Sequence, residues 1–405
     1  MASRRERRRT CLWLAEVASW RGGAVGRVCR ACGGLEAAID QPCRRLAAIV
    51  AARPDQADRR RGAARPRLDP VAAAAEERER REDALALAAA LADPEATAAR
   101  AAPGGCVVTF VDGLYPRRLA HLHDPPPALF VRGAGGPRLL ARLATSPVVA
   151  VVGTRSPSPY GREMAAAVSR GLARAGVVVV SGLATGIDSV AHAAALEEGS
   201  SGRPATLAVL GCGPDVVYPR SNRGLYERIR REGLIVSEFV WGVPARAWRF
   251  PARNRVMAGL SDAVVVVEGS ERSGSLITAD FMLDLGRPVL AVPGEVGRRL
   301  SAGPHRLLRD GARICESAAD VLAALKLEPL TCSPAGDGGW AAPHDPRTAA
   351  LLAALDRSEL SVDELAAAAS LPVRDTLSLV AQLELDDVVR ASIGGRYRLV
   401  RGRRR

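Results

Sequence analysis

Hydrophobic and polar positions alternate in blocks between residues 104 and 326. Short runs of small and branched apolar residues occupy residues 148–153, 177–182, 206–211, 234–239, 262–269 and 288–294. Amphipathic stretches of helical period separate these runs. Continuous apolar strands of this kind are typical of a parallel sheet that is covered by helices on both faces. The pattern therefore predicts an α/β domain built on an open, doubly wound sheet.

The flanking segments have a different pattern. Residues 1–100 are rich in Ala and Arg and predict a poorly defined helical region, with two short helices around a glycine turn near residues 21–23, a basic linker, and a charged helix before residue 102. Residues 327–346 have the composition of a linker. Residues 347–400 predict three helices followed by a hairpin at Gly394 and Gly395, which is the element order of a winged helix. Because the third helix of this winged-helix-like domain has few basic residues, protein contact and DNA contact are equally good expectations for it.

The net charge of the chain indicates which kind of binding partner to expect. The 405 residues include 57 Lys and Arg against 44 Asp and Glu, a formal net charge of +13. Such a balance favours nucleic acid or an anionic surface as a partner, although the arginine runs at residues 4–9, 59–61 and 401–405 are typical of solvated tails. The apolar segment at residues 11–20 is too short and too polar to span a bilayer, so we expect a cytoplasmic protein with no membrane contact.

The cysteines do not predict a metal centre. Cys29 and Cys32 form a CxxC pair, with Cys11 and Cys43 nearby, but the spacing fits no common zinc finger and no paired His follows. A zinc site is the disfavoured alternative. We expect no cofactor, because no GxGxxG or Walker A pattern follows any of the predicted strands.

Polar loops follow the predicted strands. Because the carboxyl ends of parallel strands lie at one edge of the sheet, these loops meet there. In one such loop Asp188 and His192 are four residues apart and share a helix face. An acid–base pair is one interpretation, but we favour an Asp188 that caps the helix beside a structural His192. No complete set of nucleophile, acid and base emerges, so we do not expect an enzyme.

The remaining loop residues favour an anion site. Glycines let a backbone approach a ligand, hydroxyls bond to phosphate oxygens, and arginine offers a bidentate fork. Phe250, Trp248 and Tyr160 are candidates for base stacking, with core packing as the alternative for the first two. A run such as Arg253-Asn254-Arg255 can also hold loops together through buried hydrogen bonds, so Arg155 is the first candidate for touching the ligand.

The sequences of these loops, taken in order, resemble those of a known protein family. GTRSPSPYG, SGLATGIDSVAHAAAL, AVLGCGPDVVYPRSN, LIVSEF, FPARNRVMAGLS, SGSLITAD and GRPVLAVPG occur in the order and spacing of the bacterial DNA-processing protein DprA (Smf) family. The chain resembles that family over about residues 105–325, and its C-terminal segment is similar to the winged-helix module of many members. The first hundred residues lack a clear helix-hairpin-helix or SAM-like signature, and no lysine precedes FPARNR.

The resemblance implies an extended Rossmann-like domain at residues 104–326 and a function in DNA processing. Family members bind single-stranded DNA, load RecA recombinase onto it during natural transformation, and pair as homodimers through the Rossmann-like domain. They are not known as enzymes. Carried over by motif, the residues implied to line the DNA pocket are Gly153, Thr154, Arg155, Ser181, Gly182, Phe250, Arg253, Asn254, Arg255, Ser273, Gly274 and Ser275.

Two other functions compete with this one. A nucleotide-binding or nucleotide-hydrolysing enzyme of a related Rossmann-like family would carry a pattern like PGGxGTxxE; this chain has SERSGSLITAD, which lacks the Glu at that place, although Glu268 is nearby. A winged-helix regulator could instead use the sheet domain to sense a ligand.

Overall fold

The computed structural model describes residues 2–20, 24–41, 43–51, 105–133, 136–199, 205–327, 346–355, 358–385, 388–392 and 395–399. The chain divides into two compact units, residues 1–329 and 330–405. The predicted basic linker and the charged helix before residue 102 lie outside the described residues, as do residues 328–345 of the predicted second linker.

The described part of the N-terminal segment, residues 2–20, 24–41 and 43–51, contains four helices, where the sequence predicts two short helices around a glycine turn. They are α1 (Arg4–Trp20), α2 (Ala24–Cys32), α3 (Leu35–Ile39) and α4 (Cys43–Ala51), and they share a small core around Leu14, Val28 and Leu46. The arginine run at residues 4–9 is the start of α1 rather than a tail, although most of its side chains are exposed, as expected for a solvated run. The guanidinium of Arg8 lies 3.2 Å from the carboxylate of Asp112, which gives the run a partner on the neighbouring domain.

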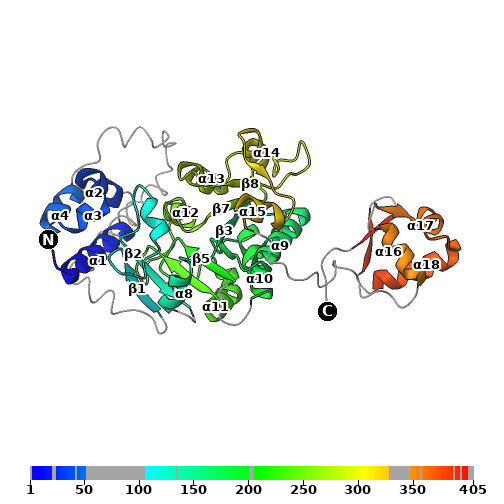
Figure 1. The fold of residues 1–405 in the computed structure, drawn as a ribbon, viewed down its shortest axis with the longest axis horizontal. Coiled ribbons are helices and arrows are strands. Elements are labelled where there is room, and N and C mark those ends of the chain that lie inside the picture. The colour runs from blue at the N-terminus through cyan, green and yellow to red at the C-terminus, as the bar shows by residue number, and fades with distance from the viewer. Residues whose placement is uncertain are drawn as a thin grey trace, which may run out of the picture. The chain divides into compact units, whose positions relative to one another are not determined.

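A nine-stranded sheet forms the centre of the first unit (Figure 1). Its order is β1-β2-β6-β5-β4-β3-β7-β8-β9, in which β1 and β2 are antiparallel additions to an otherwise parallel sheet. The strands are β1 (Gly105–Thr109), β2 (Ala128–Arg132), β3 (Val148–Val152), β4 (Val178–Ser181), β5 (Thr206–Leu210), β6 (Leu234–Ser237), β7 (Ala263–Val266), β8 (Val289–Ala291) and β9 (Arg313–Ile314). The predicted doubly wound α/β sheet is thereby confirmed.

Alternate side chains of each central strand enter two different cores. Ala150 and Val152 point into a core covered by α8 (Gly136–Arg142), α12 (Arg249–Leu260), α13 (Gly274–Asp284) and α14 (Ala302–Arg309). Val149 and Val151 point into the opposite core, covered by α9 (Pro159–Arg174), α10 (Ile187–Glu197) and α15 (Ala318–Ala324). A third core packs α11 (Arg223–Glu232) against β5 and β6. Burial on both faces explains why the strands are continuously apolar.

Two short 3-10 helices and the second unit complete the fold. The 3-10 helices are η1 (Arg117–His121) and η2 (Arg220–Asn222). The second unit contains α16 (Pro346–Leu355), β10 (Leu360–Ser361), α17 (Val362–Ala369), α18 (Val373–Leu385), β11 (Val389–Ser392) and β12 (Arg396–Leu399). The strands form a small antiparallel sheet in the order β10-β12-β11. Three helices followed by the β11–β12 hairpin make a winged helix, as the sequence predicts.

Candidate nucleic-acid interface

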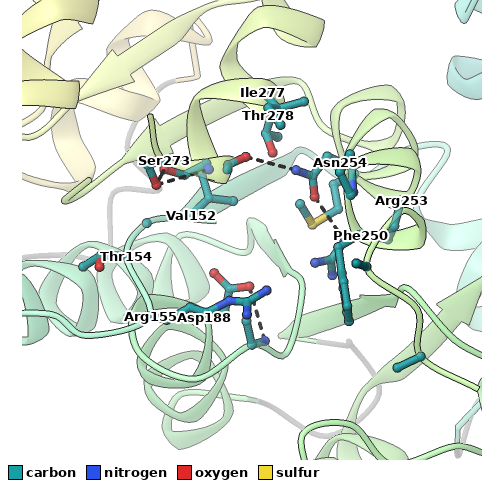
Figure 2. Close-up of a pocket in the computed structure, with 18 of the residues that line it drawn as sticks. Val152, Thr154, Arg155, Asp188, Phe250, Arg253, Asn254, Ser273, Ile277 and Thr278 are labelled. Atoms are coloured by element: carbon teal, nitrogen blue, oxygen red, sulfur yellow. Dashed lines mark hydrogen bonds between the residues drawn. The ribbon is translucent and has the colours of Figure 1, made fainter. Parts of the chain in front are cut away.

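The topology leaves a crevice at the carboxyl edge of the sheet. The chain runs from β3 outward through β4, β5 and β6, and then returns to place β7 on the other side of β3. The loops that follow β3 and β7 therefore leave in opposite directions and open a crevice between them. Ligands of doubly wound sheets bind in crevices of this kind. A cavity of about 590 Å³ lies at this point, and its walls come from the β3 loop, α12 and the start of α13. Figure 2 shows these walls facing one another.

Close backbone packing fixes the loop after β3. A Cβ on Gly153 would lie 2.6 Å from Cγ1 of Ile187, so only glycine fits there. Thr154 donates its N–H to the carbonyl oxygen of Glu268 at 2.7 Å and accepts from the N–H of Ile187 at 3.1 Å. Gly186 has a φ of 85°, and a Cβ there would overlap the carbonyl oxygen of Thr154. The next residue, Arg155, is consequently held at the surface of the cavity with its side chain exposed.

An aromatic and cationic group forms one wall of the cavity. The guanidinium carbon of Arg155 lies 5.6 Å from the centre of the Phe250 ring, within the range of a cation–π contact. Tyr218 packs against the same ring, with 5.4 Å between centroids, and keeps 43% of its surface exposed. Cations and exposed aromatic faces are the two features that attract unpaired nucleobases and their phosphates.

The opposite wall is the beginning of α13. Ser273 is the N-cap residue, and its hydroxyl accepts from the N–H of Ser275 at 3.4 Å. Asn254 of α12 donates through Nδ2 to the carbonyl oxygen of Gly274 at 3.1 Å, which ties the two helices together. Thr278 also lines the cavity, and its fully buried hydroxyl has no hydrogen-bond partner among the described residues. The positive end of the α13 dipole therefore faces the cavity across small hydroxyl side chains.

Arg253 lies beneath the cavity with 5% of its surface exposed. Its guanidinium donates to the carbonyl oxygen of Val209 and, at 3.2 Å, to Oδ1 of Asn254. Burial lowers the pKa of Arg253, while the carboxylate of Asp188 opposes that shift. The side chain borders the cavity and at the same time holds β5 against α12.

The structure brings together nine of the twelve residues assigned by motif. Those that line the cavity are Gly153, Thr154, Arg155, Phe250, Arg253, Asn254, Ser273, Gly274 and Ser275. Ser181, Gly182 and Arg255 do not line it, so their placement in the cavity wall is corrected. The hydroxyl of Ser181 is fully buried and donates to the carbonyl oxygen of Val151 at 2.7 Å, and Gly182 lies under the guanidinium of Arg253.

Arg255 points away from the cavity, on another side of α12. Its guanidinium forms an ion pair with Glu238 and lies 3.4 Å from the carboxylate of Asp124. Burial raises the pKa of Glu238 to about 7, although the charge of Arg255 opposes this change. Arg255 therefore holds the fold together, which is the alternative role that an RNR run also predicts.

Of the aromatic candidates, only Phe250 lines the cavity. The Trp248 ring instead lies 4.9 Å from the guanidinium carbon of Arg249, and the Tyr160 hydroxyl donates to the carbonyl oxygen of Pro293 at 2.7 Å. Tyr218 and Arg246 also line the cavity, although neither is among the twelve residues assigned by motif. The only sequence signal for Tyr218 is its place in a loop after a buried strand, and the loop conformation brings its ring to Phe250.

The Asp188–His192 pair does not form an acid–base unit. Gly186 is the N-cap residue of α10, so the prediction that Asp188 caps this helix is wrong. The Asp188 carboxylate instead accepts from the N–H groups of Gly182 and Ala184, at 3.1 and 3.4 Å. His192 is fully buried, its Nδ1 lies 2.7 Å from the Thr206 hydroxyl, and burial lowers its pKa to about 3.

Glu268 is likewise occupied structurally. Its carboxylate accepts from the N–H of Ser158 at 2.9 Å and from the hydroxyl of Ser158 at 2.5 Å. Ser158 is the N-cap residue of α9, so Glu268 holds the β3 loop to that helix. Glu268, the carboxylate near the place where the nucleotide-hydrolysing pattern has its Glu, thus supports the wall and does not line the cavity.

Among the described side chains of the N-terminal helices, Cys11, Cys29 and Cys32 are free thiols. Cys11 and Cys29 are buried, and burial raises their pKa values to about 12 and about 11. Within the described ranges, no group of three or more His, Cys, Asp or Glu side chains could hold a metal ion. None of the described helices has the length and apolar composition that crossing a bilayer requires.

Comparison with protein families identifies both units. The sequence model of the family described as DNA recombination-mediator protein A matches residues 106–326, more than half of the chain. The chain belongs to the DprA/Smf family. A second model, described as the DprA winged helix domain, matches residues 338–395. DprA/Smf proteins are DNA-processing proteins, and the motifs that line the cavity all lie within the first match.

Individual relatives agree with this assignment. DNA processing protein DprA of Streptococcus pneumoniae is 42% identical over 215 residues, which are 53% of this chain and 72% of that protein. Protein Smf of Escherichia coli K12 is 37% identical over 292 residues, 71% of this chain and 75% of that protein. The X-ray structure of DprA from Streptococcus pneumoniae superposes with a TM-score of 0.59 at 30% identity, covering 77% of this chain and 97% of that one.

Proposed function

We propose that this DprA/Smf protein binds single-stranded DNA in the cavity between the β3 loop, α12 and α13, and that it promotes loading of RecA recombinase onto that DNA without catalysing a reaction. The observation that carries the proposal is the group formed by Arg155, Phe250 and the start of α13. One cavity combines an exposed guanidinium, a stacking face and a helix N-terminus. These suit the phosphate, the base and a second phosphate of a flexible strand.

A single strand fits this arrangement better than a duplex. The Phe250 and Tyr218 rings can stack only on bases that are not already stacked and paired within a helix. Aromatic stacking accepts any base, so little sequence preference is expected. The cationic contribution comes from arginine, and binding through phosphate contacts weakens as the salt concentration rises.

The partner part of the proposal rests on the family. The matched model is described as a recombination mediator, and a mediator must deliver DNA to a recombinase. A role in natural transformation follows from the same relationship. A homodimer through the Rossmann-like domain is supported by β9, which has one neighbour in the sheet and leaves Ile314 56% exposed. A covering partner is one way in which such an edge is protected. Sedimentation analysis, which measures the oligomeric state, tests the homodimer.

The deciding experiment compares oligo(dT) with duplex DNA of equal length at two salt concentrations. We expect preference for the single strand, and a loss of about tenfold in affinity for Arg155→Ala, since charge-assisted bonds of this kind contribute up to ~3 kcal/mol. Equal affinity for both DNA forms, or unchanged binding by Arg155→Ala, contradicts the proposal. Nucleoside monophosphates should not be turned over by the same protein, and hydrolysis of any of them would restore the enzymatic alternative.

A further inference from the structure

Among the described residues, Arg249, the first residue of α12, is the largest side chain that is completely buried. Its Nε and Nη2 atoms donate to the main-chain carbonyl oxygen of Ser19, at 3.1 and 2.6 Å, and Nη1 donates to the carbonyl oxygen of Pro244. The guanidinium also lies over Trp248 and Phe239, at 4.9 and 5.6 Å from the ring centres. A buried guanidinium with such directed partners fixes the groups around it closely.

Ser19 belongs to the N-terminal helix α1, 230 positions away in the sequence. Its hydroxyl donates to the carbonyl oxygen of Ala15 at 2.9 Å and accepts from the N–H of Val240 at 3.0 Å. Ala15 itself is fully buried in a core with Phe239 and Val243. The C-terminal end of α1 is therefore built into the segment that leads from β6 to α12.

The same segment leads directly to the DNA-facing wall. Phe250 follows Arg249 in α12, and Arg253 and Asn254 follow one turn later, on the cavity side. A stacking ring contributes only when it is held in place, since small displacements weaken contacts that depend on geometry. The position of the first turn of α12 thus determines where the Phe250 ring stands.

We propose that Arg249 is a positioning residue through which the N-terminal helix α1 supports the DNA cavity. This inference rests on the proposed single-stranded DNA binding. Docking of α1 favours the DNA-competent position of α12 through the bonds between Arg249 and Ser19. Thermodynamic linkage then requires the reverse effect: DNA in the cavity stabilises the docking of α1.

The test uses the full chain and pairs two arginines that serve the same helix. Arg249 holds the start of α12, whereas the half-buried Arg287 donates to the carbonyl oxygens of Ala258, Gly259 and Ser261 at its end and does not line the cavity. We expect Arg249→Met to lower the affinity for oligo(dT) by about tenfold, the effect of losing one well-placed stacking contact, and Arg287→Met to change it by less than about twofold. Arg249→Lys should give an intermediate loss.

Amide hydrogen exchange supplies a measurement that a purely structural role does not change. In the wild type, saturating oligo(dT) should slow exchange in residues 4–20, while α15 on the other face stays unchanged. In Arg249→Met that protection of α1 should disappear. Protection that persists in Arg249→Met would mean direct contact between DNA and α1, and it would overturn the inference, as would unaltered exchange in the DNA-bound wild type.

The two proposals fail in different ways. A wild type that does not bind oligo(dT) removes the proposed function itself. A wild type that binds oligo(dT), with Arg249→Met binding as tightly or with equal losses in both arginine variants, removes only the support role of α1. Should Arg249→Met not fold, the exchange measurement on the wild type and the Arg249→Lys affinity still decide the question.

Discussion

The arginines of the β3 loop and of helix α12 lie at or next to the same cavity, but they have opposite roles. Arg155 is exposed and lies over the Phe250 ring. Arg249 and Arg253 are buried and donate to main-chain carbonyl oxygens of Ser19 and Val209. Burying a guanidinium is costly unless most of its donors are satisfied, so the α12 arginines depend on their fold contacts. The loop arginine keeps its donors available for a ligand.

The difference in burial predicts which arginines contribute to DNA binding and which contribute to stability, although all of them belong to one cluster of positive charge. Replacing an exposed arginine beside an aromatic face changes the free energy of unfolding only slightly. A buried arginine leaves behind carbonyl groups and carboxylates that no longer have their partner. A charge count of the motif cannot separate the two roles, whereas burial and hydrogen-bond acceptors can.

The strongest effect is expected when the buried Arg253 is replaced, and it concerns the free energy of unfolding. Arg253→Met should lower the free energy of unfolding by about 3 kcal/mol, because it leaves the buried carboxylate of Asp188 without its nearby positive charge. Arg155→Met should change the same quantity by less than about 0.5 kcal/mol. Urea denaturation of both variants measures this. Equal destabilisation by the two substitutions would remove the distinction between them.

The sequence predicts the sheet and most of the cavity for clear physical reasons. Strands buried on both faces must be continuously apolar, and parallel strands bring their following loops to one edge. Motif membership places Arg255 in the cavity wall, but the helical period does not. Arg255 lies two residues beyond Arg253, about 200° around a helix, and so faces Glu238.

Other features depend on tertiary contacts that no local pattern carries. The bonds from Arg249 to Ser19 join positions 230 apart, and neither segment shows a signal for the other. Tyr218 reaches Phe250 only through the conformation of the loop between β5 and α11. Asp188 looks like a helix cap by residue type, but the glycine before the helix takes that place and leaves the carboxylate to the preceding loop.

An effect of intermediate size concerns His192, which lies near Arg253 on the buried side. Burial, aided by the charge of Arg253, lowers its pKa from 6.5 to about 3. Below pH 6.5 the unfolded chain binds a proton that the folded protein does not. Stability is therefore fully present above pH 6.5 and is lost as the pH falls toward 3. Between pH 7 and pH 5 the wild type should lose about 2 kcal/mol through this residue.

Comparison with variants isolates that contribution. His192→Gln removes the titrating group, so its unfolding free energy should fall less than that of the wild type between pH 7 and pH 5. His121, which is exposed, provides the matched control, and His121→Gln should follow the wild type. Parallel pH curves for the wild type and His192→Gln would show that His192 does not remain neutral in the fold.

The weakest of these effects concerns Tyr218, an exposed aromatic residue of the cavity, and its contribution to the affinity for oligo(dT). Tyr218→Ala should weaken oligo(dT) binding by about fivefold, roughly 1 kcal/mol, because one aromatic face in the cavity is lost. Tyr160 is a matched control, since it is 44% exposed against 43% for Tyr218 but lies outside the cavity lining. Tyr160→Ala should bind oligo(dT) like the wild type, and Tyr218→Phe should retain the affinity. Equal losses for both alanine variants would mean that aromatic exposure alone, rather than a place beside Phe250 and Arg155, determines which rings contact DNA.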